Sequence, residues 1–421
     1  MDDILIKNIN IIKINQDSND FSKINTEKEK IENSSIAIKN GRITSISKDI
    51  SHNKSNYDKI IDGNDGYLLP GFIDAHVHLL ANGFNNEDYM SDPLSYYFYK
   101  AIPAMKKTLF AGITTARDCG LADFGVKTAI LKKLFLSPKL QISVMPLSIT
   151  GGHFDITLKS GHDMIPRYNG FPHPVCNGVE GVIAKTREVV RSGADFVKIM
   201  ASGGVISESD SPQDIQFNKK EIKAIVDEAR RLGGKYVAAH CHGLGGLELS
   251  LKAGVRTIEH GTSITKKLAH EMVDKNAFLV PTFSVIKWQR KQAKKKLFRE
   301  DKNEKALEVS KIHQENIEMA YNEEVTIAMG TDSGVMGHGE NLKELSYLSK
   351  MMSPYEAIVA GTLTSAKCLK IDNKVGSIEK GKIADLIITD KNPLDNISYL
   401  EKENNIKMVF QDGSIVKNIN I

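Results

Sequence analysis

Short apolar runs and longer amphipathic segments alternate along the middle of the chain, from about residue 73 to about residue 352. The short runs are rich in Val, Ile and Phe and are bounded by Gly, Pro or Asp, which is typical of buried β-strands. The runs that we predict as strands are FIDAHVHL (72–79), TTARD (114–118), QISVMPLSI (141–149), DFVKIMASGG (195–204), KYVAAHCHG (235–243), RTIEHG (256–261), AFLVPTF (277–283) and VTIAMGTDSG (325–334). Apolar positions recur at helical spacing in 182–191, 219–232, 244–253, 268–275, 304–323 and 342–351.

Strands that alternate with helices favour βαβ units around a parallel sheet, and eight such strands close as a (β/α)8 TIM barrel. A doubly wound open sheet is the alternative. The chain has no GxGxxG after the first strand and no GxxxxGK[ST], so neither a dinucleotide-binding nor a P-loop version of the open sheet is indicated. We therefore expect an α/β fold built on a (β/α)8 barrel.

The two ends of the chain share a different texture. Residues 4–14, 34–47 and 59–70 resemble short strands, and so do 375–392 and 405–421, with Asn-Gly and Asp-Gly turns at Asn40-Gly41 and Asp412-Gly413. Neither end is large enough for a core of its own, so we expect them to pair in one small composite β-sandwich domain. The predicted division is residues 1–70 and 353–421 for this domain, the latter with a barrel-closing helix, and 71–352 for the barrel.

Charge and cysteine content exclude several classes of protein. The chain has 421 residues with 56 Lys and Arg against 52 Asp and Glu, a formal net charge of +4, which does not call for nucleic acid or an anionic membrane as partner. Its four cysteines include no CxxC pair, so a disulfide framework is not indicated. The start has acidic residues in place of a basic leader, and no apolar run reaches the roughly 20 residues of a spanning helix. We expect a cytoplasmic protein.

Two stretches interrupt the alternation of strands and helices. Residues 153–180 follow the third strand, where a barrel places active-site loops, so they are a candidate substrate lid or an ordinary surface loop. Residues 287–305 are basic and contain one Trp and one Phe. We interpret them as a solvated helical face rather than a nucleic-acid patch, because the whole chain is nearly balanced in charge.

Polar residues cluster where the predicted strands end, which is the face where barrels place catalysis. The first strand ends in His76-Val77-His78, and residues i and i+2 of a strand point the same way. The other polar residues at strand ends are Lys198, His240, His260 and Asp332. Each alone has a structural reading: a hydrogen-bonded histidine, or a lysine paired with Asp332 or Asp195. Together they suit one or two metal ions, with zinc the first choice for imidazole and carboxylate ligands.

The ordered segments PGFIDAHVHL, FVKIMASGG, VAAHCHG, TIEHG and MGTDSG resemble the amidohydrolase superfamily of metal-dependent hydrolases. The most similar branch holds the imidazolonepropionase-like and prolidase-like enzymes, the latter including Xaa-Pro dipeptidases and zinc carboxypeptidases. The resemblance implies two zinc ions, one bound by His76, His78 and Asp332 and the other by His240 and His260. Lys198 would bridge them as a carboxylated lysine, and Asp332 would pass a proton from a metal-bridging hydroxide to the leaving nitrogen.

The resemblance also implies substrate contacts. His153, in ITGGHFD after the third strand, would be catalytic by donating to the oxyanion, or would bind a substrate carboxylate. His242 would contact the substrate or the second metal, and His338 would border the pocket.

We expect hydrolysis of an amide bond in dipeptides or N-acyl amino acids, with release of the C-terminal amino acid. Hydrolysis of cyclic amides, or of carbamates and urea derivatives, is the alternative activity, and a scaffold protein that retains the ligands is the non-enzymatic one. Small-molecule or dipeptide substrates and a homo-oligomeric state are the expected partners.

Overall fold

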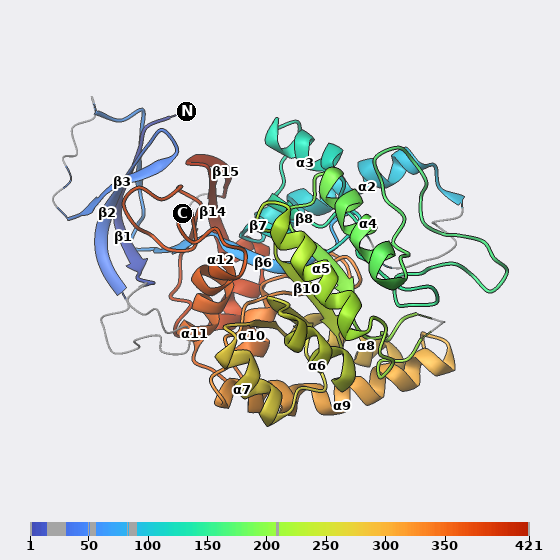
Figure 1. The fold of residues 1–421 in the computed structure, drawn as a ribbon. Helices are drawn as coiled ribbons and strands as arrows, with labels where there is room; N and C mark the ends of the chain where they lie inside the picture. The colour runs from blue at the N-terminus through green and yellow to red at the C-terminus, as the bar shows by residue number, and fades with distance from the viewer. Residues whose placement is uncertain are drawn as a thin grey trace.

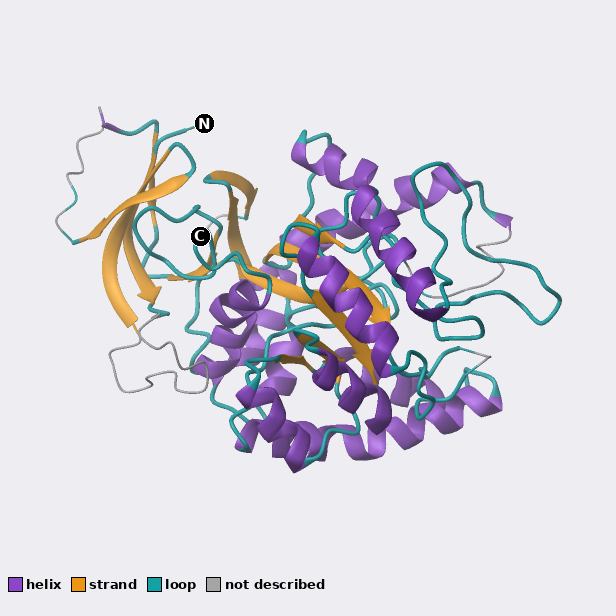
Figure 2. Ribbon diagram, in the orientation of Figure 1, coloured by secondary structure: helices purple, strands orange, loops and turns teal. Residues whose placement is uncertain are grey.

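Two parallel sheets form the centre of the larger part of the structure (Figure 1; Figure 2). The computed structural model describes residues 2–14, 31–48, 50, 56–81, 83, 91–207 and 210–419. One sheet has the order β6-β7-β8 and the other β12-β11-β10-β9. Their strands are β6 (Phe72–Val77), β7 (Ile113–Asp118), β8 (Lys139–Ile142), β9 (Val197–Met200), β10 (Val237–Cys241), β11 (Thr257–His260) and β12 (Phe278–Val280).

Isolated parallel bridges join these two sheets into a closed ring. Leu147, beyond β8, pairs with Ile199 of β9, and the segment 326–333 lies between β12 and β6 through the pairs Leu279–Ile327 and Val77–Ser333. The neighbouring strands are hydrogen-bonded to this segment. The backbone N–H of Leu279 donates to the carbonyl of residue 326, and the backbone N–H of residue 75 donates to the carbonyl of residue 329, both at 2.9 Å. All eight predicted strands therefore lie in the ring, and the predicted α/β barrel is confirmed.

Helices surround the ring and follow most of its strands (Figure 2). They are α2 (Leu94–Phe110), α3 (Phe124–Leu131), α4 (Gly178–Arg191), α5 (Lys219–Arg231), α6 (Leu244–Ala253), α7 (Lys266–Asp274), α8 (Phe283–Lys294), α9 (Glu300–Asn322), α10 (Lys343–Leu348), α11 (Pro354–Val359) and α12 (Ser365–Cys368). A π-helical segment, η2 (Ala360–Thr364), joins α11 to α12. The six predicted helices correspond to α4, α5, α6, α7, α9 and α10, and α8 contains the first part of the segment 287–305, which we predict as a helical face. The sequence pattern does not indicate α2 or α3.

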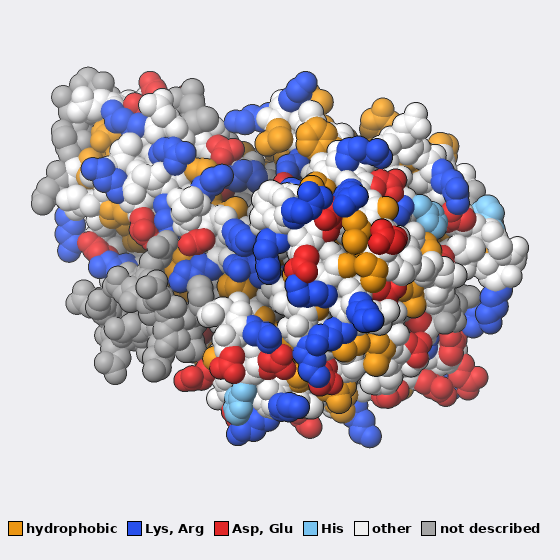
Figure 3. All heavy atoms as spheres, in the orientation of Figure 1, with side chains coloured by type: hydrophobic (Ala, Val, Ile, Leu, Met, Phe, Trp, Pro, Cys, Tyr) orange, Lys and Arg blue, Asp and Glu red, His pale blue; other side chains and the backbone are white. Residues whose placement is uncertain are grey.

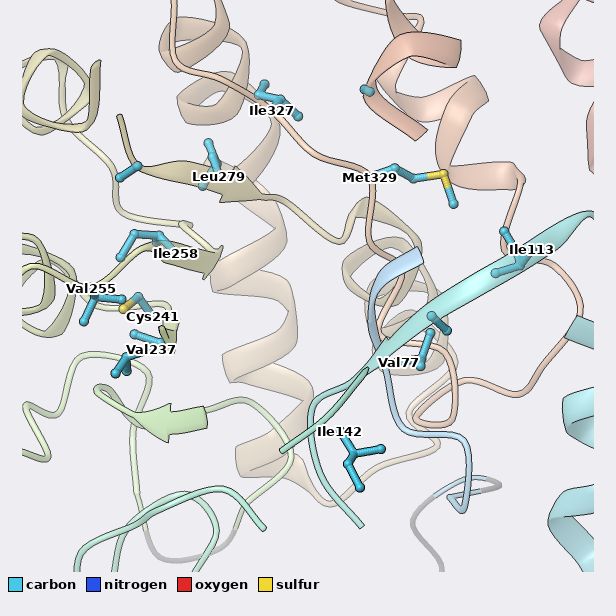
Figure 4. Packing of buried hydrophobic residues seen from close by; sticks show 14 of the residues in the cluster. Val77, Ile113, Ile142, Val237, Cys241, Val255, Ile258, Leu279, Ile327 and Met329 are labelled. Carbon is cyan, nitrogen blue, oxygen red and sulfur yellow. The ribbon is translucent and has the colours of Figure 1, made fainter. Parts of the chain in front are cut away.

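Successive side chains along the barrel strands point in alternate directions, and this separates the apolar core from the polar centre. Val77 lies between His76 and His78, and Cys241 lies between His240 and His242; both Val77 and Cys241 are fully buried members of the largest apolar cluster. Figure 4 shows Val77 and Cys241 packed among apolar side chains of the barrel strands. Because successive side chains point to opposite faces, this packing directs both pairs of histidines the other way.

Both ends of the chain contribute to one eight-stranded sheet of order β15-β14-β13-β5-β1-β2-β3, with β4 also paired to β1. Its strands are β1 (Ile4–Ile12), β2 (Ile31–Lys39), β3 (Arg42–Ser47), β4 (Lys59–Asp62), β5 (Tyr67–Pro70), β13 (Leu386–Thr389), β14 (Ile406–Gln411) and β15 (Ser414–Asn418). The short 3-10 helices η3 (Ile397–Glu401) and η4 (Glu403–Asn405) precede β14.

Strand β5 joins the two halves, because it pairs parallel with β1 and antiparallel with β13. Ile6, Ile38 and Leu386 from both ends share one apolar cluster. The composite β domain is thus confirmed, and it is hydrogen-bonded as one continuous sheet. Its predicted boundaries stay predictions, and residues 15–30 of its predicted N-terminal part lie outside the described residues.

Within the described part of the chain, no helix combines the length and the apolar character that a membrane crossing requires. Figure 3 shows Lys and Arg side chains interspersed with Asp and Glu over the face that it draws, in agreement with the near balance of charge in the sequence. The predicted cytoplasmic location and homo-oligomeric state stay predictions.

Candidate metal centre

Five imidazoles, one lysine and one carboxylate meet where the barrel strands end. His76 lies on β6, Lys198 on β9, His240 on β10 and His260 at the end of β11, while His78, His242 and Asp332 directly follow strands or the closing segment. All seven are buried. The ring centroids of His240 and His260 are 4.6 Å apart, and those of His76 and His260 are 5.1 Å apart. The predicted metal ligands therefore form one contiguous cluster.

The cluster contains two groups of three potential ligands. In the first, Asp332 Oδ1 lies 3.3 Å from His78 Nε2 and 3.5 Å from His76 Nε2. The second consists of His240, His242 and His260, and within each group the ligand atoms lie within 4.8 Å of one another. The prediction gave His242 a contact with the substrate or with the second metal, and in the structure it lies where it can serve as a third nitrogen beside His240 and His260.

Hydrogen bonds set which nitrogen of each ring has a lone pair for a metal. His78 Nδ1 lies 3.2 Å from the Gly120 carbonyl and His240 Nε2 lies 3.2 Å from the Gly203 carbonyl. A carbonyl oxygen only accepts, so these nitrogens donate, and the opposite nitrogen of each neutral ring has the lone pair. In His260, Nδ1 lies 2.7 Å from the Thr282 hydroxyl. Such fixed partners on the far nitrogen are the usual environment of a metal-binding histidine.

Burial keeps the second group neutral. It lowers the pKa of His240 and His260 well below the usual histidine value and that of His242 to about 3, and neighbouring imidazoles act in the same direction. At neutral pH these rings are therefore unprotonated, which is the form that binds a metal.

Lys198 is 1% exposed, and among the described residues its Nζ has no hydrogen-bond partner. The structure shows no ion pair between Lys198 and Asp332, and Asp195 instead accepts from Lys127 at 2.6 Å. A buried ammonium without a partner is costly by several kcal/mol. An unmodified, charged Lys198 is therefore a poor fit to this centre, whereas a group that turns its Nζ into an anionic ligand fits.

Asp332 is suited to bind a divalent cation. Burial acts to raise its pKa, but His76, His78 and Lys198 outweigh burial and lower the pKa to about 2. Its Oδ1 makes no hydrogen bond within the described residues. An ionised, buried and unbonded carboxylate oxygen beside two imidazoles is the donor set that a divalent cation such as zinc prefers.

Glu259 is a candidate positioning residue that the sequence analysis does not single out. Its Oε2 accepts from His76 Nδ1 at 2.8 Å, and its Oε1 accepts from Arg117 at 2.7 Å and from Thr257 at 2.6 Å. Burial opposes ionisation, but Arg117 lowers the pKa of Glu259 well below its usual range. Cys119 lies near His76 and Glu259, but burial raises the pKa of its thiol to about 12, so the thiol stays protonated. The sequence signal for this pair is one charged residue within each of two apolar strands, because a buried charge requires an opposite charge close by.

Two further buried carboxylates hold the strand ends. Asp118 accepts from the backbone N–H of Leu79 at 2.8 Å, and Asp74 accepts from the Thr331 hydroxyl at 2.6 Å and from Asn341 at 2.8 Å. Burial raises the pKa of both carboxyls to about 6. They fix the backbone on either side of His76, His78 and the segment that carries Asp332.

The backbone at the centre takes left-handed conformations. His260, Thr282 and Asp332 have φ angles of 66°, 53° and 60°, which cost energy for residues with a side chain and tend to occur at functional sites. Close packing also requires a glycine at 330, because a Cβ there would lie 2.4 Å from Val280 Cγ1. These features position side chains at the cost of local strain.

His153 lies beside the second group of ligands. Its ring stacks on His240 with centroids 4.4 Å apart, and its Nδ1 lies 3.1 Å from the Ser207 hydroxyl and 3.5 Å from Asp210 Oδ2. Burial acts to raise the pKa of Asp210, but hydrogen bonds from His153 and Ser207 lower it, so the carboxylate is charged. This leaves His153 Nε2 for a ligand in the cavity.

His338 lies elsewhere. Its Nε2 donates to the Ala81 carbonyl at 2.6 Å and its Nδ1 lies 3.3 Å from the Ser333 hydroxyl. Both ring nitrogens thus contact the loops that follow β6 and the closing segment, and His338 is not among the described residues that line the cavity. Its predicted contact with substrate stays a prediction.

A cavity of about 740 Å³ opens above the cluster. The predicted metal ligands and His153 form its floor. The loop that begins at residue 153 forms one wall, and α8 with the start of α9 forms another. The basic segment 287–305 is therefore only partly the solvated face that we predicted: Lys291, Lys294 and Lys296 are exposed, but Trp288 and Phe298 line the cavity.

Comparison with known proteins identifies the family. A model of the amidohydrolase family matches residues 67–416. Ochratoxinase of Aspergillus niger is 30% identical over 368 residues, which cover 83% of this chain and 75% of that protein. Imidazolonepropionase of Clostridium tetani is 26% identical over 432 residues, which cover 94% and 93%. The structure of a prolidase complexed with N-methylphosphonate-L-proline matches with a TM-score of 0.89 and 29% identity, over 99% of this chain and 100% of that one.

The family match, the named relatives and the ligand groups at the strand ends agree with one another. The chain belongs to the amidohydrolase family and is a metal-dependent hydrolase.

Proposed function

We propose that this protein is a binuclear zinc hydrolase that cleaves the amide bond of N-acyl amino acids or dipeptides and releases the C-terminal amino acid. The observation that carries the proposal is Lys198, whose buried Nζ has no hydrogen-bond partner among the described residues and lies in the cavity floor with both ligand groups. The similar prolidase, complexed with a phosphonate of L-proline, supports an amino acid as leaving group.

The residues divide naturally between two ions. His76, His78 and Asp332 would hold one, and His240 and His260 would hold the other, with His242 as a further nitrogen beside the second. When bound, the two ions would polarise the scissile carbonyl and lower the pKa of a bound water to about 7.

Lys198 would serve both ions as a carbamate. The lone pair of a neutral Nζ forms a C–N bond with carbon dioxide, and one N–H proton is lost to solvent. The product has two oxygens that share one negative charge. The buried cation is thereby replaced by an anion beside five imidazoles, which removes the cost of the unpaired ammonium.

Asp332 would move the proton. Its pKa of about 2 makes it a carboxylate at neutral pH, so it can accept the proton of the attacking water and deliver it to the leaving nitrogen as the C–N bond breaks. His153 is oriented by Ser207 and Asp210 through Nδ1. When both of its ring nitrogens carry a proton, it would donate from Nε2 to the oxygen that becomes negative during the attack.

The test is release of amino acids from Xaa-Pro, Xaa-Arg and Xaa-Phe dipeptides and from N-acyl amino acids. We expect zinc-loaded wild type to release the C-terminal residue, and Asp332→Asn to do so at least about 100-fold more slowly, the usual size of a general acid–base contribution. Equal rates for the two proteins would contradict the role of Asp332.

Hydrolysis of a cyclic amide is the second candidate, favoured by the similarity to imidazolonepropionase. The same zinc-loaded protein would then open a lactam or cyclic imide and release no free amino acid from any member of the panel. Carbamates and urea derivatives belong in the same assay, because the same chemistry cleaves their C–N bonds.

A further inference from the structure

We call the part of the cavity that is lined by residues other than the metal ligands and His153 the outer chamber. Its wall comes from the loop after residue 153, from residues 205–207 and from α8 with the start of α9. The apolar members of this wall include Ile156, Met164, Val205, Trp288, Leu297 and Phe298. A substrate whose amide bond lies at the metal ligands would place the remainder of its structure against this lining.

The charges in the outer chamber are mainly positive. Lys159, Arg299 and Lys302 line it, and Asp155 is the only acidic residue of its described lining. The oxygens of Asp155 accept from within its own loop, Oδ2 from the Gly151 N–H at 2.8 Å and Oδ1 from the Thr157 hydroxyl at 2.7 Å. Arg299 also forms an exposed ion pair, in which its Nε lies 3.3 Å from Asp301.

The aromatic wall is firmly held. Trp288 lies on α8, and its ring meets that of Phe298 edge to face with centroids 5.8 Å apart. Glu344 accepts from the backbone N–H groups of Phe283 and Ser284 at 2.7 Å each, at the start of α8. The preceding residue, Thr282, is hydrogen-bonded to His260. Trp288 is thus fixed relative to the metal centre, which is the condition for a preformed binding surface.

We propose that this chamber selects N-acylated amino acids with a large apolar, preferably aromatic, acyl group and discriminates against free dipeptides. The proposal rests on the proposed amide hydrolysis. A free dipeptide is a zwitterion, and Lys159, Arg299 and Lys302 of the cavity lining would repel its ammonium group. An N-acyl amino acid has a carboxylate and no ammonium, so the same field attracts it. A flat acyl group gains contact with Trp288 and Phe298.

The test compares two ligands that differ only in the ammonium group, 3-phenylpropanoyl-L-leucine and L-phenylalanyl-L-leucine. Trp288 is the only tryptophan of the chain, so its fluorescence reports binding to zinc-loaded Asp332→Asn. We expect the N-acyl ligand to bind at least about tenfold more tightly at low salt, and this ratio to shrink as salt is added.

Charge variants identify the source of the preference. Arg299→Gln/Lys302→Gln should reduce the ratio several-fold, whereas Lys291→Gln/Lys294→Gln, which removes equal charge from α8 outside the cavity lining, should leave it unchanged. Equal binding of the two ligands, tighter binding of the dipeptide, no fluorescence response to either, or an equal effect of both double variants would overturn the proposal.

Hydrolysis rates test the preference for a large apolar acyl group. They also separate this binding preference from the proposed amide hydrolysis. Wild type should show a higher kcat/KM for 3-phenylpropanoyl-L-leucine than for N-acetyl-L-leucine, and Trp288→Ala should reduce this preference at least fivefold. An unchanged preference would overturn the role of Trp288. Tighter binding of the N-acyl ligand without any leucine release would instead contradict the proposed hydrolysis and leave the binding preference standing.

Discussion

The Nδ1 atom of His76 donates a hydrogen bond of 2.8 Å to Glu259, whose other oxygen accepts from Arg117 at 2.7 Å. His76, Glu259 and Arg117 are all buried and lie on three different strands of the barrel. The carboxylate fixes the tautomer that directs the Nε2 lone pair of His76 toward Asp332. Arg117 in turn keeps that carboxylate ionised inside the barrel.

Glu259→Gln should therefore weaken zinc binding by about 10- to 100-fold, the usual effect of losing a partner that orients a ligand. It should also destabilise the protein by about 3 kcal/mol, because Arg117 loses its counter-charge. Competition with a chromophoric chelator measures the first effect and urea unfolding the second. Adding Arg117→Met should recover part of the stability but not the zinc affinity. Wild-type zinc affinity in Glu259→Gln would contradict this role.

His313 on α9 holds the strained backbone behind His260. Burial lowers the pKa of His313 to about 4, so the ring is neutral at pH 7, and its Nε2 lies 2.9 Å from the Pro281 carbonyl and 3.2 Å from the His260 carbonyl. His313→Leu should cost about 1 to 3 kcal/mol of stability and lower zinc affinity, while His313→Gln, which keeps an N–H donor, should retain more of both. The two variants behaving alike in chelator competition would refute a role for the donor.

Glu344 should make stability depend on pH. Burial raises its pKa from 4.5 to about 8, despite hydrogen bonds from Ser284 and Phe283. Between these two pH values the folded protein retains a proton on Glu344 that the unfolded chain has lost. The contribution of this group to the free energy of unfolding is therefore fully present below about pH 4.5 and is lost as pH rises toward 8. The slope from this group is up to about 1.4 kcal/mol per pH unit.

Urea unfolding at several pH values in this window measures the slope. Asp74 and Asp118 have raised pKa values as well, so the informative quantity is the difference between wild type and Glu344→Gln, whose side chain does not titrate. We expect a shallower slope in the variant. Parallel curves would show that Glu344 is ionised in the folded protein throughout the window.

Gly204 provides the space that His153 occupies. A Cβ at residue 204 would lie 1.9 Å from His153 Cε1, and nothing lies within 4 Å of a Cβ at Gly181. Gly204→Ala should displace the imidazole and lower kcat at least about tenfold with zinc content unchanged, whereas Gly181→Ala should be active. Full activity in Gly204→Ala would argue against His153 as an oxyanion donor.

The sequence predicted the barrel and its polar centre because both follow from local regularities. Strands and helices alternate with their own periods, and polar residues at strand ends meet in a closed parallel sheet. The pairing of His76 with His78 and of His240 with His242 follows from alternation alone. The closing segment is predicted as a regular strand, but it pairs through isolated bridges, and Asp332 near its end has a left-handed backbone.

Other features depend on contacts between distant elements, which periodicity does not encode. The charges of Arg117 and Glu259 stand in apolar strands 142 residues apart, and only the closed ring brings them together. The basic segment with Trp288 was interpreted as solvated because its lysines dominate the composition. Its apolar residues Trp288 and Phe298 line the cavity, and Glu344, on α10, accepts hydrogen bonds from the start of α8.

Zinc stoichiometry in Lys198 variants tests the central claim most directly. The account predicts two zinc ions per chain in wild type, and fewer, with loss of amide hydrolysis, in Lys198→Ala and Lys198→Met. Short carboxylic acids such as acetate or propionate should restore zinc and activity to Lys198→Ala, where the missing side chain leaves room, but not to Lys198→Met, where the side chain fills it. Two zinc ions and full activity in Lys198→Ala without added acid would contradict a binuclear centre bridged by Lys198.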